Sequence, residues 1–256
     1  MVTYRGSRKH VLDLVKGCPE SLAKLLHGTG AVLKHGWIPH GYDSPDETKL
    51  EVGCGLLPDE VCRQLGDWWL VHKLRANVPN WDLVCPCMIN GEPGLLLVEA
   101  KANDVELKAY GKPLAADASQ RSRENHESIG MAIAQARDAL DRAVGGIRIS
   151  RDLNYQLSNR VAFAWKIASL GTPTILMYLG FPNDAGIRDV GQPLADDRHW
   201  RELFWSHART VLPESFEDRL VDCGRATMQF IVRSAEVTSP SPARRAVPLS
   251  QRTMER

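Results

Sequence analysis

Apolar residues recur at helical spacing in several stretches of the chain. Residues 57–74 carry aliphatic and aromatic side chains three or four positions apart, after a proline suited to a first helical turn. Residues 155–170 are apolar on almost every side after their first turn, which predicts a helix buried all round, and Gly171 is a suitable helix end. Shorter apolar clusters within residues 11–26 predict one or two further helices.

Strands are predicted where apolar runs are bounded by turn residues. Trp81–Ile89 and Gly94–Ala102 form one such pair, joined by Asn90-Gly91-Glu92-Pro93, which is a strong turn signal. The apolar run Thr174–Phe181 predicts a buried strand. An amphipathic helix around residues 200–207 and a strand at 228–232 follow. Before residues 155–170, residues 129–140 predict an inserted helix, with Ile129, Ile133, Ala136 and Leu140 on one face. The order helix, strand, strand, inserted helix, helix, strand indicates an α/β domain with a mixed central sheet flanked by helices.

We expect one main domain with peripheral segments. The parts are an N-terminal helical and loop segment packed on the core (1–56), a core (57–182) with an insertion (103–146), a helix–strand extension (183–238) and a Pro/Ser/Arg-rich disordered tail (239–256). No apolar run reaches the roughly 18 residues that a membrane span needs. The N-terminus also lacks an apolar signal core, so we expect a cytoplasmic protein.

The charge and the cysteine content exclude few classes of protein or site. With 32 basic and 31 acidic residues, the net charge of +1 neither supports nor excludes a nucleic-acid partner. The six cysteines contain no CxxC pair, which argues against a disulfide framework. Cys85 and Cys87 would share a strand face, but no second ligand pair stands at a zinc-like spacing, so buried apolar positions are the better interpretation.

Three charged residues interrupt the predicted apolar hairpin: Asp82, Glu99 and Lys101. Burying a charge is costly, so such residues need a partner, a metal or a catalytic task. Residues two apart in a strand share a face, which places Glu99 and Lys101 together. If the four turn residues form the whole loop, Ile89 lies opposite Gly94.

Counting back from that pair places Asp82 opposite Lys101, and all three charged groups converge on one side of the sheet. A slip of one residue would move Asp82 to the other side. Pro86 needs an edge position or a bulge, because it cannot donate to a ladder.

Two carboxylates that face one another bind a hard divalent cation such as Mg²⁺ or Mn²⁺. Such a cation lowers the pKa of a bound water and stabilises charge on a phosphate, and a nearby ammonium can orient that water. These residue types therefore indicate phosphodiester hydrolysis. A structural ion pair in an unrelated α/β protein is the competing interpretation.

Asp82 followed, after a hairpin's length, by Glu99-Ala100-Lys101 resembles the motif of the PD-(D/E)xK (restriction-endonuclease-like) nucleases. The resemblance covers roughly residues 57–182. It implies a restriction-endonuclease-like core in which Asp82 and Glu99 hold Mg²⁺ (or Mn²⁺) and Lys101 assists the attacking water. Trp81 stands where the motif has proline, and the insertion at 103–146 is long.

The resemblance implies two more site residues. Glu60 is the candidate for an extra acidic metal ligand on the first helix, although a first-turn acidic residue is also explained by the helix dipole. Gln156 is the candidate for a catalytic glutamine on the second helix, with Arg160 one turn further on the same side. A capping or solvated polar turn explains Gln156 and Arg160 about equally well.

The expected function is that of a metal-dependent nuclease, most readily a DNA endonuclease, in defence or repair. The alternative is a non-catalytic nucleic-acid-binding or complex-assembly protein on the same fold. Phosphate contacts are expected from the insertion and from the second helix, through Lys108, Arg121, Arg123 and Arg160. Because cutting two strands takes two active sites, a homodimer is compatible with this function, but no sequence feature supports it.

Overall fold

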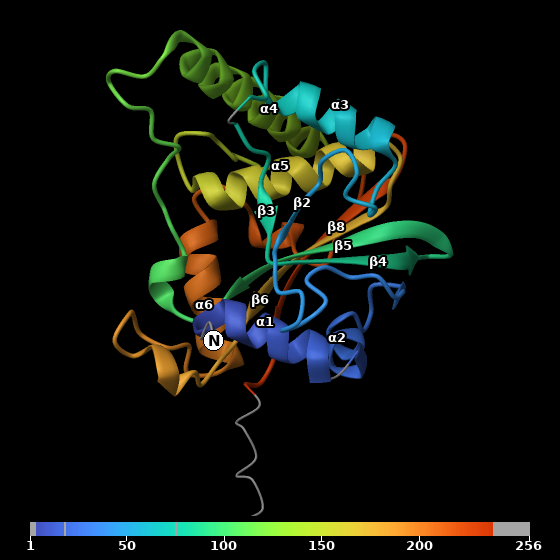
Figure 1. Ribbon diagram of the computed structural model, residues 1–256, viewed down its shortest axis with the longest axis vertical. Coiled ribbons are helices and arrows are strands. Elements are labelled where there is room, and N and C mark those ends of the chain that lie inside the picture. Colours follow the sequence, from blue (N-terminus) through green and yellow to red (C-terminus); the bar gives the residue numbers. More distant parts are fainter. Residues whose placement is uncertain (1–3, 18, 75, 238–256) are drawn as a thin grey trace, which may run out of the picture.

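A mixed six-stranded sheet forms the centre of the computed structural model, which describes residues 4–17, 19–74 and 76–237 (Figure 1). The tail expected to be disordered, 239–256, lies outside the described residues. The strand order is β1-β4-β5-β6-β8-β7. The strands are β1 (Ala31–Leu33), β4 (Leu83–Ile89), β5 (Glu92–Lys101), β6 (Thr174–Gly180), β7 (Leu220–Asp222) and β8 (Thr227–Ser234). A separate two-stranded ribbon pairs β2 (Thr48–Lys49) with β3 (Asn80–Trp81).

The sheet is antiparallel at its edges and parallel in its centre. β5, β6 and β8 run parallel, while β1 with β4, β4 with β5, and β7 with β8 pair antiparallel. The α/β class with a mixed sheet is therefore confirmed. Among the described residues the short strands β1, β2 and β7 have no counterpart in the sequence prediction, because two or three residues carry too little periodicity to be recognised.

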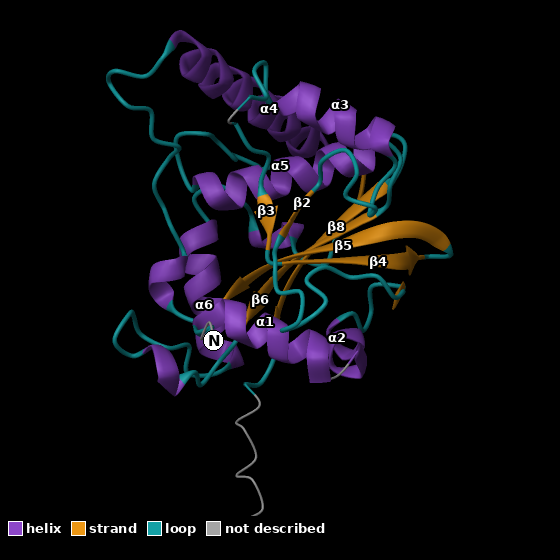
Figure 2. Cartoon of the chain, viewed as in Figure 1, coloured by secondary structure: helices purple, strands orange, loops and turns teal. Residues whose placement is uncertain are grey.

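Helices cover both faces of the sheet, as the alternation of helix and strand layers in Figure 2 shows. On one face lie α1 (Gly6–Gly17) and α2 (Pro19–Leu25). On the other lie α3 (Asp59–Trp69), α4 (Gln120–Val144), α5 (Tyr155–Ser169) and α6 (Asp197–Ala208). Three single turns of 3-10 helix occur at Asp104–Glu106, Ala185–Ile187 and Glu214–Phe216. The prediction of one helix over 57–74 is too long at its end, since Leu70 is extended.

The helix α5 is buried on almost all sides, as its sequence predicts. Its inner side packs on β6, while α3 and α4 pack against it from outside (Figure 1). The alternating strand residues Val84, Leu95 and Leu97 point toward this helix layer. Their neighbours point to the layer of α1 and α2. Side chains on the α5 face of β5 from Leu95 onward are therefore shielded from water.

The β4–β5 hairpin differs from the sequence prediction in its register, but each side chain lies on the face of the sheet that was predicted. Its turn has two residues, Asn90 and Gly91, with φ of 50° and 88°, so Ile89 pairs with Glu92 and not with Gly94. Positive φ at both positions is the geometry that an Asn-Gly hairpin turn favours. The error is two residues, and since side chains alternate with a period of two, every residue keeps its predicted face.

Pro86 creates no bulge, although a bulge was one of the two arrangements that the sequence predicted for it. The ladder runs unbroken through Pro86 opposite Leu95. Its neighbour on the other side is the chain after β1, where the Lys34 N–H donates to the Pro86 carbonyl (2.9 Å) and pairing resumes only at Ile38 with Val84. The missing N–H of Pro86 therefore faces a stretch where the adjacent segment leaves the sheet.

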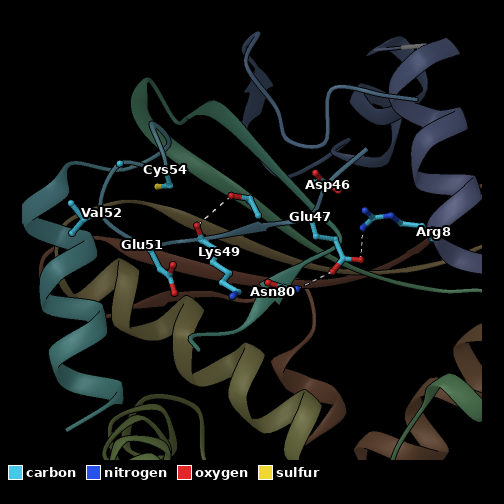
Figure 3. A pocket seen from close by; sticks show the side chains of 10 residues that line it. Arg8, Asp46, Glu47, Lys49, Glu51, Val52, Cys54 and Asn80 are labelled. Atoms are coloured by element: carbon cyan, nitrogen blue, oxygen red, sulfur yellow. Dashed lines mark hydrogen bonds and ion pairs between the residues drawn. The ribbon is translucent and has the colours of Figure 1, made fainter. Parts of the chain in front are cut away.

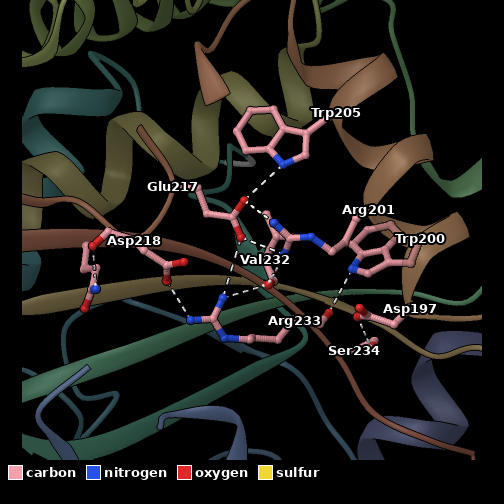
Figure 4. Close-up of polar contacts among 10 residues, drawn as sticks. Asp197, Trp200, Arg201, Trp205, Glu217, Asp218, Val232, Arg233 and Ser234 are labelled. Atoms are coloured by element: carbon pink, nitrogen blue, oxygen red, sulfur yellow. Dashed lines mark hydrogen bonds and ion pairs between the residues drawn. The ribbon is translucent and has the colours of Figure 1, made fainter. Parts of the chain in front are cut away.

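The helix α6 is fixed to β8 by a half-buried acidic residue, Glu217. Its carboxylate accepts hydrogen bonds from Arg201 (2.7 and 2.9 Å) and from the Trp205 indole (3.1 Å), as Figure 4 shows. One turn before Trp205 along α6, the indole of Trp200 donates to the Arg233 carbonyl on β8 (2.8 Å). These contacts place Trp200 directly over the end of β6.

Gly180, at the end of β6, is expected to be essential for this packing. A Cβ there would lie 2.6 Å from the fully buried Trp200 ring. We expect Gly180→Ala to lower the free energy of unfolding by about 1–3 kcal/mol, the usual cost of overpacking. The control is Gly66→Ala within α3, where a Cβ would meet only the flexible end of Lys73 at 3.4 Å. That change should stabilise by up to about 1 kcal/mol. Equal melting temperatures for the two variants would contradict the prediction.

Candidate functional site

Glu99 is the centre of a buried polar network on the α5 face of the sheet. It is 2% exposed, and Lys101, two residues along β5, is 4% exposed. Lys101 Nζ lies 2.5 Å from Glu99 Oε1. From α5, Gln156 Nε2 donates to Oε1 (2.8 Å) and Arg160 Nε donates to Oε2 (2.6 Å). The predicted placement of Glu99 and Lys101 on one face is therefore confirmed, and the structure brings Gln156 and Arg160 to the same carboxylate.

The two cations keep Glu99 ionised despite its burial. Burial alone would raise the pKa of Glu99, but the positive charges of Arg160 and Lys101 and their hydrogen bonds outweigh it. The pKa of Glu99 consequently lies below its ordinary value. Removing either cation would leave a buried charge only partly compensated.

Asp82 joins the network from the point where the chain leaves the sheet. The last ladder pair is Leu83 with Val98, and continuing that register places Asp82 opposite Glu99. This corrects the predicted pairing with Lys101. The carboxylate replaces a backbone acceptor of a neighbouring strand here, since Oδ2 accepts a hydrogen bond from the Ala100 N–H at 2.7 Å. Burial and the negative charge of Glu99 raise the pKa of Asp82 to about 7.

Arg160 is held by more than its ion pair. Its guanidinium lies over the ring of Trp81, 4.8 Å from the ring centre, and Nη1 donates to Asn159 Oδ1 (2.8 Å). Cation–π contact of this kind favours Arg over Lys. We name the set Asp82, Glu99, Lys101, Gln156 and Arg160 the Glu99 network. It contains two acidic and two basic side chains.

Two further residues border this network and were missed by the sequence interpretation. Tyr178 on β6 pairs with Glu99 on β5, and its side chain is 1% exposed. His207 on α6 has a pKa lowered to about 4 by burial and, secondarily, by the positive charge of Lys101. Helical spacing indicated only a core role for His207, and Tyr178 looked like one more apolar strand position. No local pattern relates either residue to Glu99.

Other predicted site residues lie outside the network. Glu60, the predicted metal ligand, is exposed, and its carboxylate is bound by Arg63 and Gln64 on its own helix. Arg123 donates to the Ala116 and Ala118 carbonyls (2.7 and 3.1 Å), so it braces the turn before α4. Lys108 and Arg121 are exposed. Within the described residues, no hydrogen bond or ion pair joins these four side chains to the Glu99 network.

A polar pocket of about 620 Å³ opens beside the ribbon that leads to Asp82. Glu47 lies within it, between Arg8 and Asn80, as Figure 3 shows. Its negative charge adds a small upward contribution to the pKa of Asp82. The pocket lining includes three acidic and two basic side chains: Asp46, Glu47, Glu51, Arg8 and Lys49. This balance does not give the positive field that phosphate binding favours.

Within residues 4–17, 19–74 and 76–237, no group of three or more His, Cys, Asp or Glu residues is arranged so that it could hold a metal ion. In the same part of the chain no helix has the length and hydropathy needed to traverse a bilayer. Comparison with protein-family models, curated proteins and solved structures finds no match for this chain.

The raised pKa of Asp82 predicts a pH-dependent stability difference. Below about pH 4 the carboxyl group is protonated in the folded and unfolded states alike. Between about pH 4 and 7 the unfolded chain releases this proton while the folded protein retains it, so Asp82 increasingly favours unfolding. Asp82→Asn removes this effect and keeps an oxygen for the Ala100 N–H.

We therefore expect the melting temperature of Asp82→Asn, relative to that of the unchanged protein, to rise from pH 4 to about pH 7 and to level off by pH 8. Thermal unfolding followed by circular dichroism across this range measures the difference. A difference that stays constant with pH, or that shrinks as the pH rises, would show that the pKa of Asp82 is not raised.

Proposed function

We propose that this protein is a divalent-metal-dependent nuclease, with DNA as the favoured substrate and Asp82, Glu99 and Lys101 at its active centre. The observation that carries the proposal is the meeting of two carboxylates and a lysine on one face of an otherwise apolar hairpin. Burying such groups is costly, and a catalytic or metal-binding task accounts for retaining them.

The donor set fits a hard divalent cation. Only Oδ2 of Asp82 has a hydrogen bond among the described residues, which leaves Oδ1 available. The Ala100 carbonyl leaves β5 on the same edge as its N–H, next to Asp82. Both oxygens of Glu99 are engaged, so Glu99 joins the cation only after Lys101 releases Oε1. Three oxygen ligands with open positions for water suit Mg²⁺ or Mn²⁺ better than zinc.

Each residue then has a chemical role. A bound cation would lower the pKa of a water and stabilise negative charge on the phosphate. Lys101, once released from Glu99, can hold the attacking water and stabilise charge that develops on the phosphoryl oxygens. Gln156 and Arg160 keep the Glu99 carboxylate in place. Because Arg160 is buried, we assign it this role and not the substrate contact that its sequence position suggested.

The arrangement of elements supports a restriction-endonuclease-like core, with one change from the sequence interpretation. The β4–β5 hairpin is followed, after the inserted helix α4, by α5 and then by β6, which lies parallel to β5. The helix α3, expected to be the first core helix, lies on the same face as α5. The opposite face is covered by α1, which precedes β1. We therefore propose α1 as the first core helix, and this change removes the structural reason for a metal role of Glu60.

A second candidate is a non-catalytic nucleic-acid-binding or complex-assembly protein on the same fold. The observation that favours it is the pairing of the Glu99 carboxylate with Lys101 and Arg160, which compensates this buried charge without a metal. Such a network could serve only to fix α5 on the sheet. Activity and metal binding separate the two candidates.

Cleavage should require the metal and Lys101. With Mg²⁺ or Mn²⁺, the protein is expected to cut DNA, and Lys101→Met should reduce the rate at least about 100-fold, as for loss of a group that stabilises developing charge. The control is Glu60→Gln, which alters an exposed carboxylate outside the network and should leave the rate unchanged. Gel analysis of single-stranded and duplex substrates, with and without EDTA, provides the measurement. A folded protein without cleavage on any substrate favours the second candidate.

Metal binding should depend on Asp82 in the same way. Calorimetric titration of Mn²⁺ into the protein is expected to give one site, and Asp82→Asn should weaken it at least about tenfold through loss of a charged ligand. Because Asn keeps the bond to the Ala100 N–H, the variant separates metal binding from folding. Equal affinity in both proteins would remove Asp82 from the metal site.

A further inference from the structure

The hydroxyl of Tyr178 is a buried donor without a partner in the described part of the chain. The residue is 1% exposed, and its oxygen has no hydrogen bond. Leaving such a group unpaired costs free energy, and native proteins seldom do so without a reason. A partner is therefore expected in a second arrangement of the neighbouring groups.

The place of Tyr178 in the sheet identifies that partner. β6 runs parallel to β5, and Tyr178 is the register partner of Glu99, so both side chains point to the α5 face. Phe204 and Phe230 lie 5.0 and 5.9 Å from its ring centre and restrict the ring. Burial and the charge of Glu99 raise the pKa of Tyr178, so the hydroxyl remains a neutral donor.

Glu99 loses a donor whenever Lys101 leaves it. In the arrangement described, Oε1 accepts from Lys101 and Gln156, and Oε2 accepts from Arg160. The proposed function requires Lys101 to release Oε1, which would leave a buried carboxylate with one cation fewer. A neutral hydroxyl on the adjacent strand can restore one hydrogen bond to Glu99. Because the hydroxyl carries no charge, it leaves the negative charge of Glu99 available to a metal.

We infer that Tyr178 is a positioning residue that donates its hydroxyl hydrogen bond to Glu99 when Lys101 leaves the carboxylate. The inference rests on the proposed function only for the event that frees Lys101. The same exchange of donors can be produced without a metal by replacing Lys101. The exchange therefore has a test of its own.

The test is a double-mutant cycle in thermal stability, measured in EDTA with Tyr178→Phe, Lys101→Met and the combined variant. In the unchanged protein, Tyr178→Phe should leave the melting temperature the same or raise it, because it removes an unpaired hydroxyl. With Met at position 101, the same change should lower the melting temperature by about 3–10 °C, the effect of losing a hydrogen bond to a charged group. An equal effect in both backgrounds would overturn the inference.

Metal binding gives a second readout. Tyr178→Phe is expected to weaken Mn²⁺ binding about tenfold, because Glu99 would be less well held when Lys101 moves away. The control is Tyr42→Phe, whose hydroxyl donates to Asp13 at 2.7 Å. It should lower the melting temperature and leave Mn²⁺ affinity unchanged. Equal affinity in Tyr178→Phe and the unchanged protein counts against the inference. A wild-type protein that binds no Mn²⁺ contradicts the proposed function, while the cycle still decides the role of Tyr178.

Discussion

The ionised carboxylate of Glu99, enclosed between Lys101 and Arg160 in the interior of the protein, constrains much of the structure around it. A charge at this depth is tolerated only when opposite charges and hydrogen-bond donors surround it. The cations come from two elements, β5 and α5, which must therefore stay in one relative position. The polar network and the apolar packing of α5 thus fix the same interface.

Other elements of the fold shield the interface between β5 and α5 from water. The helices α3 and α4 pack on the outside of α5, and the Trp81 ring lies against Arg160. The helix α6 closes the end of the layer through Trp200 and the ion pair of Arg201 with Glu217. In a medium of low polarity, interactions between charges are stronger than in water. The cluster is therefore sensitive to the loss of any one of its members.

Strand periodicity was sufficient to predict the face of the charged residues, although not their partners. The length of the turn at Asn90-Gly91 was ambiguous, and the chosen length displaced every pair by two residues. Because the side-chain repeat is also two, the facing was unaffected. Likewise, the spacing of Gln156 and Arg160 by one helical turn predicted that they face the same side, and both bond to Glu99.

Contacts between distant segments could not be predicted in this way. Helical spacing identifies the apolar side of α3 but not which face of the sheet it covers, so Glu60 was placed in a site that it does not approach. The proximity of Tyr178 to Glu99 depends on the register of two parallel strands joined by a long crossover. The environment of His207 depends on how α6 docks. Both are properties of the assembled sheet and have no local signature.

Pro86 has a consequence for the edge of the sheet that borders β4. Because the chain leaves the sheet between Lys34 and Ile38, the strand bordering β4 is divided into a three-residue piece and an isolated bridge. Long, continuous edge strands are templates on which another chain can add a strand, and proline and short edges prevent this. Pro86 in the inner strand thus lies beside a short and divided outer strand, an edge that offers another chain few free N–H and C=O groups in a row.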